Sequence, residues 1–214
     1  MLRIAIVDDH PVARHGIAAI LAAFDDFEVA CAVPHPDELP RAGDGAVAAD
    51  LVLLDLYQAD GRPALPAIAE LSVRVPVLVV SASRAPADVL AAMQSGASGY
   101  LTKQASEEAY AIAIRSVTTG GFYFSSQLAD LIQAATLNRK PIRSQESLSP
   151  REQEALAFIA RGFTHQQAAK RMGVSKATVD TYVARIRAKL QLGNKAELAL
   201  AALRYLPTSP GPPP

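Results

Sequence analysis

Five short apolar runs recur along the first half of this chain, separated by turns and by stretches with helical spacing. Several runs are apolar at every position, which is typical of strands covered on both faces. Such strands alternating with helices predict a doubly wound, parallel, five-stranded α/β sheet. The runs are RIAIV, FEVACAV, DLVLLDL, VPVLVVSA and SGYLTK, beginning at residues 3, 27, 50, 75 and 98.

The connections between the runs support the same fold. Two of them, RHGIAAILAAF and PADVLAAMQSG, have helical character, as does SEEAYAIAIRSVTTG after the fifth run. The connection PHPDELPRAGDG contains Pro34, Pro36 and Pro40. Because proline removes a backbone donor and clashes inside a helix, we expect the second helix to be short or irregular.

Polar residues stand where four of the strands end. Asp8 and Asp9 follow the first strand, Asp55 ends the third, Ser81 the fourth and Lys103 the fifth. Ligands of such sheets bind at the carboxyl ends of the strands, so these side chains should share one edge. Three clustered carboxylates repel one another unless a cation intervenes, and oxygen ligands suit Mg²⁺. Each residue alone fits a solvated loop, a helix cap or a surface lysine; their joint placement favours a magnesium and phosphoryl site.

Charge divides the chain into two unlike parts. Residues 1–124 carry a balance of −7 and residues 125–214 a balance of +7, although the whole chain is neutral. A basic module makes a polyanion partner plausible. We expect one domain at 1–120, a partly helical linker at 121–146, a second domain at 147–206 and a disordered tail at 207–214. Within the linker, residues 127–137 fit a helix and NRKPIRSQES fits a connector.

The second module is a series of short capped helices. SPRE predicts a capping box between Ser149 and Glu152, with Pro150 at the first helical position. THQQ and NKAE repeat the box at Thr164 with Gln167 and at Asn194 with Glu197, and Ser175 caps the helix KATVDTYVARIRAKL. Glycines 162, 173 and 193 fit helix ends. Four helices are expected in roughly sixty-five residues, a size at which a small domain folds.

HQQAAKRMGVSKATVDTYVARI has the order helix, tight turn, helix of a helix-turn-helix. Val179, Val183, Ile186 and Leu190 fall on one face of the second helix and should pack inward. Small residues on the opposite face would let it approach a major groove while basic residues meet phosphates; Lys170 and Arg171 of the preceding helix could also do so. The alternative is a solvated basic helix in a small bundle. The predicted DNA-facing residues are Lys176, Ala177, Thr178, Thr181, Ala184, Arg185, Ala188 and Lys189.

The first module resembles the receiver domain of two-component response regulators, which has a flavodoxin-like fold. The motifs VDDHP, LLD, Ser followed by Ala, and GYLTK occur in the family's order and spacing. The resemblance implies that a histidine kinase phosphorylates Asp55 and that Ser81 and Lys103 bind the phosphoryl oxygens. It also implies that Tyr100 is the family's switch aromatic; the simpler alternative, an interfacial ring on an edge strand, is compatible with that role. The implied Mg²⁺ ligands are Asp8, Asp9, Asp55 and the main-chain carbonyl of Tyr57.

The second module resembles the LuxR-type DNA-binding domain of NarL/FixJ-type regulators over about residues 147–204. Two positions depart from the family. Relatives often have Lys and His where this chain has Asp180 and Tyr182, so base preference cannot be transferred from them. Asp180 could accept a hydrogen bond from cytosine or weaken nonspecific binding. The last segment, KAELALAALRYL, implies a dimerisation helix by resemblance, and packing within the monomer is the competing use.

Together these features predict a DNA-binding response regulator, not a turnover enzyme, in which phosphorylation at Asp55 alters dimerisation or domain arrangement. Expected partners are a histidine kinase, promoter DNA and a second copy of the chain. The loop DLYQADGRPALP departs from the family and supports an alternative, a phosphorylation-independent regulator with a receiver used for dimerisation or ligand sensing. A Mg²⁺-dependent phosphohydrolase ranks last. The single cysteine, Cys31, in an apolar run, and the absence of a signal or membrane segment favour the cytoplasm.

Overall fold

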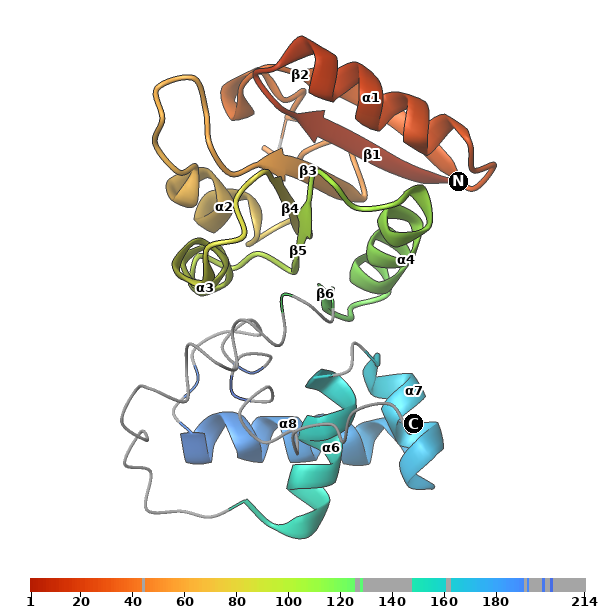
Figure 1. Cartoon of the computed structure of the whole chain (residues 1–214). Helices are drawn as coiled ribbons and strands as arrows, with labels where there is room; N and C mark the ends of the chain where they lie inside the picture. Colours follow the sequence, from red (N-terminus) through yellow and green to blue (C-terminus); the bar gives the residue numbers. More distant parts are fainter. Residues whose placement is uncertain are drawn as a thin grey trace, which may run out of the picture.

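The computed structural model describes residues 1–43, 45–125, 128, 148–160, 163–190, 192, 198 and 201. These residues form an α/β part that precedes an all-helical part (Figure 1). None of the helices in the described ranges is long and apolar enough to cross a membrane.

The α/β part is built on a parallel sheet. Its strand order is β2-β1-β3-β4-β5-β6, so the chain starts near the middle and extends in both directions. This order confirms the doubly wound prediction. The strands are β1 (Leu2–Val7), β2 (Phe27–Val33), β3 (Leu51–Asp55), β4 (Val77–Ser81), β5 (Gly99–Thr102) and β6 (Tyr123–Phe124).

The sixth strand, β6, was not predicted. It contains only two residues, too few to show a periodic pattern, and it pairs with the start of β5. Gly99 permits this pairing, because a Cβ there would lie 2.8 Å from the carbonyl oxygen of Tyr123. The prediction of five strands is therefore corrected to six, with the extra strand at the edge next to β5.

Four helices cover the two faces of the sheet, as Figure 1 shows: α1 (Pro11–Ala22) and α4 (Glu107–Thr118) on one side, α2 (Leu65–Leu71) and α3 (Pro86–Gln94) on the other. Alternate strand residues divide accordingly. Ile4 and Ile6 pack with α1 and α4, whereas Ala5 and Val7 pack with α2 and α3. The proline-rich connection forms a single 3₁₀ turn, Pro36–Glu38, which confirms the expected irregular element.

The helical part contains α6 (Pro150–Ala160), α7 (His165–Met172) and α8 (Lys176–Leu190). Its predicted caps are confirmed where the structure describes them. Ser149 and Glu152 form reciprocal hydrogen bonds, as do Thr164 and Gln167, and Ser175 accepts from the N–H of Thr178. Gly173 ends α7 with a φ of 66°, in the left-handed region that favours glycine.

Several predictions fall on residues outside the described ranges. These are the linker helix apart from Leu128, the connector, the cap at residues 194–197, the tail, and glycines 162 and 193. Of the predicted fourth helix, Leu198 and Ala201 are described, and both are helical. Leu198 is fully buried against the core that α6, α7 and α8 share.

Candidate functional site

The polar residues at the strand ends gather at one edge of the sheet. β1, β3, β4 and β5 are consecutive neighbours, so the groups that follow them are neighbours too. Asp55 pairs with Val80 and Ser81 with Thr102 in the sheet registers. Asp8, Asp55 and Ser81 are buried. We call Asp8, Asp9, Asp55, Ser81 and Lys103 the rim cluster.

Lys103 bridges two carboxylates of the rim cluster. Its Nζ lies 2.7 Å from Oδ2 of Asp8 and 2.7 Å from Oδ2 of Asp55. Burial raises the pKa of Asp55, and the hydrogen bond from Lys103 only partly offsets that increase. Burial lowers the pKa of Lys103, but its bonds to Asp55 and Asp8 outweigh this and leave the pKa above its ordinary value. The ammonium therefore stays charged between the two acids.

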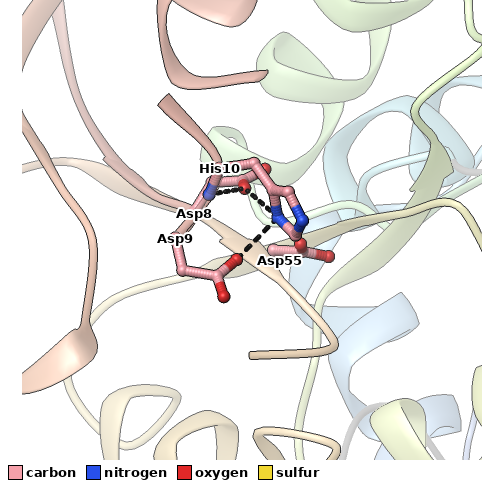
Figure 2. A group of neighbouring side chains, drawn as sticks. All are labelled: Asp8, Asp9, His10 and Asp55. Carbon is pink, nitrogen blue, oxygen red and sulfur yellow. Dashed lines mark hydrogen bonds and ion pairs between the residues drawn. The ribbon is translucent and has the colours of Figure 1, made fainter. Parts of the chain in front are cut away.

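The carboxylates are arranged as a cation site would require. Oxygens of Asp8, Asp9 and Asp55 and a ring nitrogen of His10 all lie within 4.8 Å of one another (Figure 2). Oδ2 of Asp8 and Oδ1 of Asp9 are buried and are paired with Lys103 and His10, each at 2.7 Å, with no further hydrogen-bond donor among the described residues. Buried carboxylate oxygens of this kind suit a hard divalent cation, so the residues present fit Mg²⁺.

His10 is a member of this group that the sequence interpretation did not name. Its Nδ1 lies 2.7 Å from Oδ1 of Asp9 and 3.4 Å from Oδ1 of Asp8, while most of its side chain is exposed. Its backbone N–H also donates to Oδ1 of Asp8. The available signal was its position directly after the acidic pair in VDDHP.

The loop after Asp55, where the sequence departs from the family, is held by short contacts. Tyr57 forms an isolated antiparallel β-bridge with Pro63, and the Tyr57 hydroxyl donates a hydrogen bond to Oδ1 of Asp88 at 2.9 Å. That bond raises the pKa of Tyr57. The side-chain amide of Gln58 donates a hydrogen bond to the main-chain carbonyl of Asp55 at 3.3 Å. The predicted role of the Tyr57 carbonyl as a metal ligand stays a prediction.

Tyr100 is fully buried, and its strand is not an edge strand, because β6 pairs beyond it. The alternative of an interfacial ring on an edge strand is therefore wrong. The hydroxyl of Tyr100 donates to the carbonyl of Ser83 at 3.1 Å, and burial raises its pKa to about 12. The ring therefore joins β5 to the segment that follows Ser81.

Helix α8 presents the two faces expected from its sequence. Val179, Val183, Ile186 and Leu190 are buried. Thr178 is half-buried; the exposed residues of the opposite face are Ala177, Thr181, Ala184, Arg185 and Ala188. The structure thus leaves small side chains and Arg185 exposed on this face, and their contact with DNA stays a prediction.

Two lysines predicted on this surface are already paired. Lys189 lies 2.8 Å from Oε2 of the buried Glu152, and Lys176 lies 2.9 Å from Oδ2 of Asp180. Oδ1 of Asp180 lies 2.6 Å from Nδ1 of His165 on α7. The bonds from Lys176 and then His165 lower the pKa of Asp180. Asp180 therefore links α7 to α8, a contact that the sequence interpretation did not foresee.

Comparison with known proteins gives the same two parts. Residues 4–115 match the response regulator receiver domain, and residues 146–202 match the bacterial regulatory proteins of the luxR family. The chain is 34% identical over 209 residues to the methanol utilization control regulatory protein MoxX of Paracoccus denitrificans, covering 95% of this chain and 92% of that protein. It is 28% identical over 201 residues to the nitrate/nitrite response regulator NarL of Escherichia coli K12, covering 92% and 93%.

Solved structures of full length are also similar. The response regulator ChrA of a heme-sensing two-component system has a TM-score of 0.53 at 29% identity, covering 96% of this chain and 98% of that chain. RcsB from Salmonella enterica serovar Typhimurium, bound to promoter P1flhDC, has a TM-score of 0.55 at 20% identity, covering 95% and 98%, and shows the fold alone. With both modules matched and their order preserved, the chain belongs to the response regulators that join a receiver domain to a LuxR-type DNA-binding domain.

Proposed function

We propose that this response regulator is switched by phosphorylation of Asp55 and thereby changes how its second domain binds promoter DNA. The observation that carries the proposal is the rim cluster, in which Lys103 bridges the buried carboxylates of Asp55 and Asp8 beside a buried oxygen of Asp9. Such a site can offset the charge of a transferred phosphoryl group. Asp55 ends its strand beside Ser81, which places a hydroxyl donor at the same edge.

In the proposed step, a carboxylate oxygen of Asp55 attacks the phosphorus of a phosphohistidine on the kinase. The new bond joins that oxygen to phosphorus, and the phosphorus–nitrogen bond breaks with its electron pair returning to the imidazole. Lys103 and Ser81 hold the phosphoryl oxygens. Asp8, Asp9, Asp55 and the Tyr57 carbonyl would hold Mg²⁺, which when bound supplies positive charge to the phosphoryl oxygens.

The output lies in the second domain, residues 147–206. Helix α8 would enter the major groove with the small side chains of Ala177, Thr181, Ala184 and Ala188 against the bases. Arg185 is exposed and can meet a phosphate directly, whereas Lys176 and Lys189 would first have to leave Asp180 and Glu152. A homodimer would place two such helices on neighbouring half-sites of the DNA. We propose that the protein acts in the cytoplasm.

Intact mass after incubation with Mg²⁺ and acetyl phosphate tests the proposal. One phosphoryl addition is expected in the wild type, and none in Asp55→Asn or in the presence of EDTA. Promoter affinity and oligomeric state would then be compared between the two forms, and a difference is expected because phosphorylation must favour one arrangement over another. Unchanged affinity and oligomeric state, with or without the phosphoryl group, would favour the phosphorylation-independent alternative.

A further inference from the structure

Asp180 is the only acidic residue of α7 and α8, whose other charged side chains are all basic. Both of its carboxylate oxygens have a partner. Oδ1 lies 2.6 Å from Nδ1 of His165 on α7, and Oδ2 lies 2.9 Å from Nζ of Lys176, one turn earlier on α8. The bond from Lys176, followed by that from His165, lowers the pKa of Asp180, which keeps the carboxylate ionised at neutral pH.

The ion pair lies at the end of α8 that a helix-turn-helix directs at DNA. Residues at the N-terminus of a recognition helix contact base edges and the phosphates beside them. Lys176 is the first residue of α8. Its side chain is 56% exposed and that of Asp180 is 42% exposed, so both are accessible from solvent. A DNA phosphate would therefore compete directly with Asp180 for the Lys176 ammonium.

The contacts of Asp180 favour one of the two roles that its sequence position left open. A carboxylate that reads cytosine must present an oxygen to the base, whereas each oxygen of Asp180 contacts a side chain of the protein itself. One of these contacts comes from His165, which lies on the other helix and is the more buried partner. The carboxylate is thus fixed from two sides, an arrangement suited to retaining a cation.

Arg185 is the contrasting cation of the same helix. It is exposed, and no acidic side chain among the described residues pairs with it. When Arg185 meets a phosphate, the DNA releases counterions and the protein loses no ion pair. Lys176 can gain a phosphate only by leaving Asp180, so its net contribution to DNA binding should be small.

We propose that Asp180 holds Lys176 away from DNA phosphates and thereby lowers the affinity of the second domain for DNA of arbitrary sequence. The inference rests on the proposed entry of α8 into the major groove. Binding to arbitrary sequences comes almost wholly from contacts between cations and phosphates, so the loss of one contact weakens it everywhere. Base contacts made by α8 then supply a larger share of the affinity at a promoter site.

The salt dependence of DNA binding tests this role. The full-length protein, with and without acetyl phosphate and Mg²⁺, is titrated onto a fluorescent duplex of mixed sequence at KCl concentrations from about 50 to about 200 mM. Asp180→Asn should bind more tightly than the wild type at low salt. Across this range it should lose about threefold more affinity than the wild type, as expected for one additional phosphate contact. Lys176→Ala should change the wild type little but should return Asp180→Asn to the wild-type salt dependence.

Matched variants separate this local restraint from the general effect of net charge. Glu154→Gln removes the same charge from an acid of similar exposure, 39% against 42%, which pairs with Arg151 on α6. It should leave the salt dependence unchanged. Arg185→Ala removes an unrestrained cation and should make the salt dependence shallower by about one phosphate contact. Asp180→Ala repeats the main test without an amide in place of the carboxylate, and thermal unfolding establishes that each variant is folded.

The outcomes distinguish this inference from the proposed function. Unchanged salt dependence in both Arg185→Ala and Asp180→Asn would contradict the proposed DNA surface of α8 and the inference with it. A shallower dependence in Arg185→Ala, with Asp180→Asn unchanged, would overturn the restraint of Lys176 alone. So would weaker binding by Asp180→Ala, the result expected if the carboxylate accepted from cytosine. A steep dependence that persists when Lys176→Ala is added to Asp180→Asn would also overturn it, because another cation would then make the additional contact.

Discussion

The two parts of the chain each bury charged side chains, but they balance the charge differently. In the rim cluster three carboxylates face one lysine, and the other basic neighbour, His10, is mostly exposed. In the helical part, Glu152 accepts from the Ser149 N–H at 2.7 Å and from Lys189 at 2.8 Å. The first arrangement leaves negative charge to be compensated from outside, whereas the second is satisfied within the protein.

This difference is what the proposed magnesium and phosphoryl site predicts for the rim cluster, and a structural role predicts for Glu152. Buried like charges cost stability, so an excess of carboxylates is retained where a cation or a phosphoryl group uses it. A buried carboxylate with an amide donor and an ammonium partner holds neighbouring elements together. Glu152 joins the start of α6 to the end of α8 through its ion pair with Lys189. Loss of this ion pair should weaken the packing of α6 against α8.

The largest effect should come from removing the lysine of the rim cluster. Lys103→Met leaves Asp8 and Asp55 buried without their ammonium partner, which should destabilise the receiver by about 3 kcal/mol at pH 7 in EDTA. Hydrogen exchange of peptides from β1 and β3 measures this locally. Mg²⁺ should recover part of the loss, because it replaces positive charge between the same carboxylates.

An exposed ion pair provides the matched control for Lys103. Arg41 lies 2.9 Å from Glu70 on the surface, so Arg41→Met should cost no more than about 0.5 kcal/mol. Equal losses for the two substitutions would show that the carboxylates of the rim cluster do not depend on Lys103.

The next largest effect should come from Glu152. Glu152→Gln weakens the bonds to Ser149 and Lys189 and leaves the lysine without a charged partner, which should cost about 2 kcal/mol. Exchange of α6 and α8 peptides should accelerate while receiver peptides keep their rates. The exposed pair of Arg151 with Glu154 on the same helix is the control, and Glu154→Gln should change little. Faster hydrogen exchange confined to receiver peptides would contradict the structural role of Glu152 between α6 and α8.

Local sequence signals predicted the positions of the main elements well. Apolar runs located five strands, and polar residues at their ends located most of the rim cluster, because parallel strands bring their carboxyl ends to one edge. Capping residues set the starts of the described helices in the second part, since they bond to backbone groups only three residues away. The two-residue β6 left no pattern to detect.

Contacts between distant residues were not accessible in this way. Tyr57 and Asp88 are separated by 31 positions, and Glu152 and Lys189 by 37. The prediction that Lys189 faces DNA rests on helical spacing, which gives the direction of a side chain but not its partner across the fold. The same limit applies to Asp180, whose contacts with His165 and Lys176 depend on how α7 packs against α8.

The smallest effect, and the sharpest contrast between the clusters, should be their opposite response to acid. Burial raises the pKa of Asp55, so its contribution to stability is fully present below its unfolded value of 3.8 and is lost as the pH rises through its folded pKa. The Lys189 bond and the Ser149 amide lower the pKa of Glu152 from 4.5, so its contribution is present above that value and lost as the pH falls through its folded pKa. As the pH falls from 7 to 3, the opening free energy measured by hydrogen exchange should therefore increase at β3 and decrease at α6. Asp55→Asn should remove the increase at β3, and Glu152→Gln should remove the decrease at α6. Parallel pH profiles for the two parts in the wild type would show that charge balance does not distinguish them.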